Sequence, residues 1–112
     1  MGLFSFGSGK TLSTIQQRGS FYELYDASGK KYKTVSVATL GSIVGYSSTY
    51  FICQRGAFYE LYDSEAKKFK TISIATIGEI VSVTGDTFVS RRGAFLETYD
   101  KNCKKISTRP AR

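Results

Sequence analysis

The sequence predicts an all-β domain built from three copies of one antiparallel unit of four short strands. A nine-residue segment that begins at Arg18 returns 37 residues later at Arg55 and again at Arg92. Runs rich in β-branched and aromatic residues alternate with turn residues every 8–10 positions, which is typical of antiparallel sheets. No stretch shows the 3.6-residue period of a long amphipathic helix.

The repeat spans nearly the whole chain. Residues 18–54 and 55–91 align without a gap and share 19 of 37 residues. The expected copies are residues 1–37, 38–74 and 75–112, with 1–11 as a divergent first segment. Three equal copies favour a pseudo-threefold domain such as a β-prism or β-trefoil. The alternative is three propeller blades completed by dimerisation.

Within one copy, short strands follow one another through turns. The strands expected in order are 79–83, 87–91 and 94–99, with the turn 84–86 between the first two, and 69–74 shows the fourth strand in the preceding copy. Their β-branched and aromatic content predicts strands, and the one proline, Pro110, lies beyond the last of them.

A two-residue hairpin with glycine first is predicted at Gly19, Gly56 and Gly93, because this turn needs a positive φ angle. In that register Arg18 lies opposite Phe21, and Arg18 shares a face with Glu23. The same arginine and glutamate recur in every copy, so we expect an ion pair across each hairpin.

A second turn is predicted at residues 26–30, with Gly29 in the left-handed conformation. The later copies carry Ala66 and Cys103 at that position. Those two turns must therefore differ from the first or carry strain.

The two faces of the strand around Tyr59 are both apolar. Phe58 and Tyr62 lie on one face with Glu60, and Tyr59 and Leu61 lie on the other. This pattern predicts strands that are buried on both sides, in a crowded assembly of small sheets.

The order of strand, glutamine, glycine turn, strand ending in tyrosine and polar turn resembles the repeat of the monocot mannose-binding lectins. The matching segments are 17–25 and 54–62, each beginning with glutamine and ending with tyrosine. The resemblance implies a β-prism. It does not extend to the sugar site, whose Asp, Asn and Val positions hold Gly19, Phe21 and Glu23 in the first segment. The Tyr-Asp-x-x-Gly-Lys segment also resembles propeller blades.

Basic residues exceed acidic ones by 16 to 9, which gives a net charge of +7 and favours polyanionic partners. Lysines cluster at the second turn of each copy, where they flank Tyr32 and Phe69, an arrangement that can hold phosphates and stack bases. The candidate polyanion-binding residues are Lys30, Lys31, Lys33, Lys67, Lys68, Lys70, Lys104, Lys105 and Arg109. The alternative role of these lysines is to prevent edge-to-edge pairing of strands.

We expect binding and not catalysis. The chain has no histidine, which removes the commonest general base and metal ligand, and no cofactor or metal site is expected. Cys53 and Cys103 are expected to be free thiols in the cytoplasm, because no signal peptide or membrane span is evident. The leading hypothesis is an interaction module for a protein or glycan, and the alternative is a nucleic-acid binder. A monomer is favoured over a homodimer.

Overall fold

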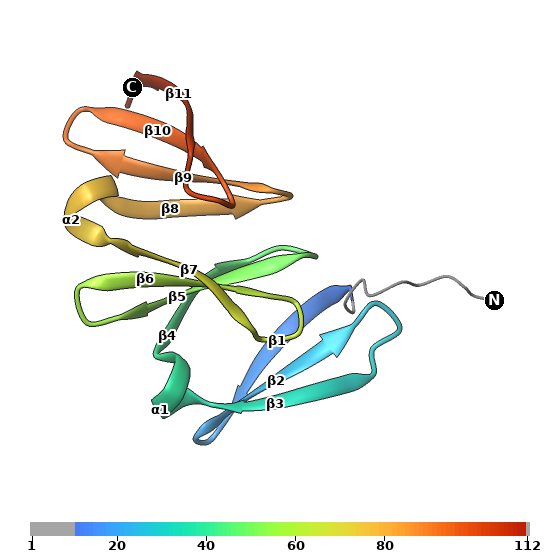
Figure 1. Cartoon of the computed structure of the whole chain (residues 1–112). Coiled ribbons are helices and arrows are strands. Elements are labelled where there is room, and N and C mark those ends of the chain that lie inside the picture. The colour runs from blue at the N-terminus through green and yellow to red at the C-terminus, as the bar shows by residue number, and fades with distance from the viewer. Residues whose placement is uncertain (1–10, 112) are drawn as a thin grey trace.

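The structure is a computed structural model that describes residues 11–111 of the chain. Three antiparallel sheets follow one another along the sequence (Figure 1). Sheet 1 comprises β1 (Leu12–Arg18), β2 (Phe21–Asp26) and β3 (Lys31–Ser36). Sheet 2 comprises β4 (Ser42–Tyr46), β5 (Tyr50–Arg55), β6 (Phe58–Asp63) and β7 (Lys68–Ser73). Sheet 3 comprises β8 (Glu79–Thr84), β9 (Thr87–Arg92), β10 (Phe95–Asp100) and β11 (Lys105–Pro110). The all-β prediction is confirmed, but sheet 1 has three strands among residues 11–111 where four were expected. Pro110, expected beyond the last strand, instead ends β11 opposite Phe95, where an edge strand tolerates the missing N–H group.

Two one-turn helices connect the sheets, and the sequence did not predict them. They are α1 (Val37–Leu40) and α2 (Ile74–Ile77), the second beginning at a residue expected to end a strand. The Ser36 and Ser73 side chains accept hydrogen bonds from the helix backbone and cap their N-termini. Four residues are too few to produce a helical period in the sequence, so no pattern could reveal them.

The glycine hairpins adopt the predicted conformation. Gly19, Gly56 and Gly93 have φ angles of 60°, 63° and 63°. At the second turn, Ala66 and Cys103 have φ angles of 68° and 66°, so both adopt the left-handed conformation with a side chain present. These two turns therefore carry the strain expected of a non-glycine residue there. In the second copy, the Asp63 carboxylate stabilises the turn by accepting two backbone N–H bonds.

Sheet 2 lies between its two neighbours, and both of its faces are buried. One face contributes Phe51, Cys53 and Tyr62 to a hydrophobic cluster shared with sheet 1. The opposite face contributes Tyr50, Tyr59, Ile52 and Leu61 to a second cluster, shared with sheet 3. The apolar residues on both faces of this strand therefore reflect burial on both sides, as predicted.

Sheets 2 and 3 approach each other closely at their first strands, β4 and β8. A Cβ atom on Gly45 of β4 would lie 2.6 Å from the Cγ2 atom of Val83 on β8, so only glycine fits there without a shift. The β1–β2, β5–β6 and β9–β10 hairpins lie on one side of the stack of sheets, toward the left of Figure 1. The turns that carry the lysines, between β2 and β3, β6 and β7, and β10 and β11, lie on the other side.

This close approach generates a test of the packing between sheets 2 and 3. We expect Gly45→Ala to lower the free energy of unfolding by about 1–3 kcal/mol, because the added methyl group overpacks the contact with Val83. Val83→Ala removes the opposing methyl groups, so the double variant is expected to be more stable than the sum of the single effects by ~0.5–3 kcal/mol. Urea denaturation measures all three. Ser82→Ala, at the equivalent position of sheet 3, is the control, and additive effects would contradict the contact.

Candidate functional site

Three of the nine predicted polyanion-binding residues are already held by carboxylates. The Nζ atoms of Lys31, Lys68 and Lys105 lie 3.3, 3.3 and 3.4 Å from the Oε2 atoms of Glu23, Glu60 and Glu97. These lysines are therefore part of the ionic structure of each sheet, and an anionic ligand would have to compete with a neighbouring carboxylate.

The other six predicted residues have exposed side chains that form no ion pair within residues 11–111. They are Lys30, Lys33, Lys67, Lys70, Lys104 and Arg109. They lie on the edge strands β3, β7 and β11 and in the turns before them. The Tyr32 hydroxyl donates a hydrogen bond to the carbonyl oxygen of Ser64 in sheet 2, so this ring packs between sheets. Phe69 is 39% exposed and remains available for stacking.

The arginine–glutamate pair predicted across each hairpin is present in all three sheets. Arg18 Nε lies 3.4 Å from Glu23 Oε1, and the equivalent distances in sheets 2 and 3 are 3.9 and 3.7 Å. A lysine and a tyrosine complete each cluster. In sheet 1 the Tyr25 hydroxyl donates to Glu23 Oε1 at 2.8 Å. Each buried glutamate thus has two cationic neighbours and one hydroxyl donor.

These contacts change the acidity of the glutamates. The hydrogen bond from the Tyr25 hydroxyl is the largest cause that lowers the pKa of Glu23, and Lys31 adds to it. The hydroxyl of Tyr99 lowers the pKa of Glu97 in the same way. The same hydrogen bond raises the pKa of Tyr25.

Three half-exposed phenylalanines recur at one position of the fold, and the sequence analysis did not select them as a site. Phe21, Phe58 and Phe95 are 51%, 48% and 50% exposed. Each is the first residue after a glycine hairpin and lies opposite the hairpin arginine, as Phe58 lies opposite Arg55. We call these three residues the phenylalanine row. Their repetition was visible in the sequence, but their exposure was not.

The arginines beside the row are fixed by a second contact. Arg55 Nη1 donates to the carbonyl oxygen of Thr39 in α1 at 2.9 Å, and Arg92 Nη1 donates to that of Thr76 in α2 at 3.1 Å. Each bond satisfies a carbonyl near the end of a short helix. The Phe58 and Phe95 positions therefore combine an exposed ring with an arginine whose position is constrained.

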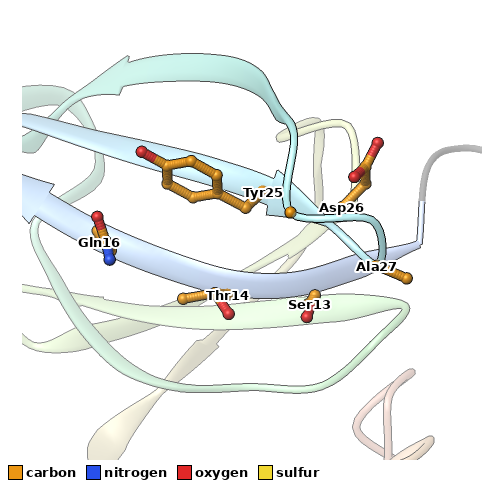
Figure 2. Close-up of a pocket in the computed structure, with 7 residues that line it drawn as sticks. Ser13, Thr14, Gln16, Tyr25, Asp26 and Ala27 are labelled. Atoms are coloured by element: carbon orange, nitrogen blue, oxygen red, sulfur yellow. The ribbon is translucent and has the colours of Figure 1, made fainter.

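The outer face of sheet 1 contains a hollow of about 350 Å³ (Figure 2). Its lining residues are Ser13, Thr14, Gln16, Tyr25, Asp26, Ala27 and Gly29. Thr14 and Gln16 occupy the positions that hold the fully buried Phe51 and Cys53 in sheet 2. Because sheet 1 has no preceding sheet among residues 11–111 to cover this face, the smaller and more polar residues leave an open space.

The outer face of sheet 3 is also more polar than its equivalents. Thr98 replaces the buried Leu61 of sheet 2. Arg91 and Arg109 lie on either side of Leu96 in one row across β9, β10 and β11. Glu79 on β8 lies opposite Arg91 in the strand register. The two arginines are exposed and form no ion pair within the described part of the chain.

Neither cysteine forms a disulfide in the described chain. Burial raises the pKa of the Cys53 thiol to about 12 and also raises that of Cys103. Both thiols therefore stay protonated near neutral pH, which makes them weak nucleophiles. Residues 11–111 contain no group of three or more histidine, cysteine, aspartate or glutamate side chains placed to hold a metal ion. Neither helix described is long and apolar enough to cross a membrane.

No protein-family model matches this chain, and no curated protein matches its sequence.

The glutamate clusters predict a defined dependence of stability on pH. Because the folded pKa values of Glu23 and Glu97 lie below the ordinary value of 4.5, the unfolded chain binds more protons as the pH approaches that value. Their stabilising contribution is present above pH 4.5 and is lost as the pH falls through the lower folded pKa values. We expect Glu23→Gln and Glu97→Gln to flatten the decrease of the melting temperature between neutral and acidic pH. Glu79→Gln is the control and should leave the profile unchanged, because Glu79 is exposed and forms no ion pair within residues 11–111. Parallel profiles for all variants would contradict the assignment.

Proposed function

We propose that this protein is a non-catalytic binding module that engages a protein or glycan through the phenylalanine row. The observation that supports this function is the half-exposed phenylalanine at the same position of all three sheets. A single exposed apolar residue needs no explanation, but three rings at equivalent positions, each beside a glycine hairpin, are a repeated exposed feature.

A protein is the partner that this surface favours. Aromatic residues and arginine are enriched in the buried centres of protein interfaces, and each position of the row combines the two. The hairpins hold the rings on β-strands, so little conformational entropy would be lost on binding. Three equivalent contacts on one rigid body would also raise affinity through effective concentration.

The architecture that we propose for the module is three blade-like sheets in an open row. This row is neither a closed prism or trefoil nor a ring of propeller blades completed by dimerisation. The support is the pair of hydrophobic clusters, each shared by consecutive sheets, together with the close approach of β4 and β8. We also propose that the chain acts as a monomer. The polar residues on both outer faces, such as Thr14 and Thr98, resemble the caps that keep repeat arrays soluble.

The row is tested by replacing its members singly and together. We expect peptides selected from a random library on the native protein to lose affinity stepwise as Phe21, Phe58 and Phe95 are changed to Ser. Surface substitutions of this kind usually alter stability by less than ~0.5 kcal/mol, so melting temperatures should remain close to native. Ile106→Ser is the matched control, because Ile106 is 57% exposed and lies outside the row.

Binding is measured by interferometry with the protein immobilised, and a glycan panel is screened in parallel. A glycan that binds through the row would make the ligand a carbohydrate. Peptides and glycans that bind the triple serine variant as tightly as the native protein would overturn the proposed surface.

A polyanion such as nucleic acid is the second candidate ligand. The observation that favours it is a set of exposed basic side chains that form no ion pair in the described chain. The set includes the turn lysines and the two arginines on either side of Leu96, Arg91 and Arg109. An anionic polymer that contacts several of these bases would release counterions on binding, so its affinity would fall steeply with salt.

A heparin column with a rising salt gradient tests this candidate. If the second candidate holds, changing Arg91 and Arg109 to Gln should lower the salt concentration at elution, and so should changing the three turn lysines Lys30, Lys67 and Lys104. Replacing Lys31 or Lys68, which already pair with glutamates, should have a smaller effect. Elution of the native protein at low salt would exclude polyanion binding through these residues.

A further inference from the structure

The hollow on sheet 1 lies where the other two sheets place an aromatic ring. In sheet 2, Phe51 pairs with Tyr62 across two strands, and their rings stack with centroids 5.2 Å apart and an interplanar angle of 9°. In sheet 3, Phe88 and Tyr99 repeat this arrangement at 5.4 Å and 14°. Sheet 1 has the same register between Thr14 and Tyr25, but threonine supplies no ring. Among residues 11–111, Tyr25 therefore has no stacking partner equivalent to Phe51 or Phe88.

The Tyr25 ring is held in place by the contacts of its own hydroxyl group. Tyr25 donates its hydroxyl hydrogen bond to Glu23, which Arg18 and Lys31 hold from two sides. Tyr62 and Tyr99 make the same bond to their own glutamates while stacked. The orientation of the Tyr25 ring thus does not depend on an adjacent phenylalanine.

The hollow is large enough to admit one aromatic ring, and its lining suits the edge of such a ring. Its volume of about 350 Å³ falls at the lower end of ordinary ligand pockets. The side chains around Tyr25 include the hydroxyls of Ser13 and Thr14 and the amide of Gln16, and Figure 2 shows these polar groups along β1 beside the ring. The edge of an aromatic side chain carries positive partial charge, which suits a rim of oxygen atoms.

We propose that the outer face of sheet 1 is an acceptor site for one aromatic side chain of a protein partner, which stacks on Tyr25 in the position that Phe51 and Phe88 occupy in the other sheets. This site extends the proposed function, because it takes the partner to be a protein, and it lies on the same face of sheet 1 as Phe21. An aliphatic side chain would fill the space without the stacking energy, which for aromatic pairs is ~0.5–1.5 kcal/mol beyond area burial.

The site is tested with a small probe before any partner is known. N-acetyl-tyrosinamide is titrated into the isotope-labelled full-length protein, and amide shifts are followed by NMR. We expect saturable shifts at Thr14, Gln16 and Tyr25. N-acetyl-leucinamide should bind roughly three- to tenfold more weakly, which corresponds to the stacking energy of one aromatic pair. Equal binding of the two probes, or shifts spread over other surfaces, would overturn the proposal.

The matched variant is Thr14→Phe, which introduces the residue that the repeat carries elsewhere. We expect it to fill the hollow, to abolish the shifts caused by the tyrosine probe and to leave the fold intact. Thr34→Phe adds a ring to the same face outside the hollow and should leave binding unchanged. Should Thr14→Phe unfold, Tyr25→Leu provides the second variant, and it should reduce binding of the tyrosine probe to that of the leucine probe. Unchanged binding in both variants would exclude the site.

Two further variants separate the possible outcomes. The chain carries Phe4 and Phe6 outside the described residues, and one of these rings is an alternative occupant. Probe binding that appears only after both are changed to Ser would assign the site to the chain itself and overturn the proposal. Phe58→Ser should leave probe binding unchanged. If the probe binds sheet 1 but the serine variants of the phenylalanine row keep native affinity for the selected peptides, the proposed function is rejected and the acceptor site stands. If those variants lose peptide affinity but the probe does not bind, the acceptor site is rejected and the proposed function stands.

Discussion

Burial of sheet 2 on both faces is the constraint on which the rest of the structure depends. Its strands present Phe51 and Tyr62 to one neighbour and Tyr50 and Leu61 to the other, so neither face is stable in water alone. Each such side chain contributes about 1.5–3 kcal/mol when it leaves water. Sheets 1 and 3 are needed to provide that burial. A repeat unit of this size gains its core from its neighbours.

The same constraint divides the repeat into interior and terminal positions. Phe51 and Leu61 of sheet 2 face a neighbouring sheet, whereas the equivalent positions on the outer faces carry Thr14 and Thr98. The polar replacements lower the cost of exposing these faces to water. They also make the two outer faces chemically different. The outer face of sheet 1 exposes Tyr25 beside a hollow, and the outer face of sheet 3 carries Arg91 and Arg109 on either side of Leu96. A threefold repeat therefore produces an asymmetric molecule.

The features that recur without regard to burial are of another kind. The arginine, glutamate, lysine and tyrosine cluster is present on the covered face of sheet 2 and on the open face of sheet 1 alike. In each sheet it joins three consecutive strands: the arginine ends the first, the glutamate and tyrosine lie on the second, and the lysine begins the third. The phenylalanine row recurs beside it and stays half-exposed throughout. The recurrence of an exposed ring at this position in every sheet is the observation on which the proposed function rests.

The sequence by itself determined the repeat, the strands, the glycine hairpins and the diagonal pairing of Arg18 with Glu23, because these depend on local periodicity and on backbone angles that only a few residues adopt. It did not determine α1 and α2, which are too short to have a period. It did not separate Lys31, which is paired, from Lys30, which is not. Only the tertiary structure decided that sheet 2 is covered on both faces, that Phe58 is exposed and that a hollow lies beside Tyr25. Each of these depends on which face another sheet covers, and contacts between residues distant in the chain leave no local pattern.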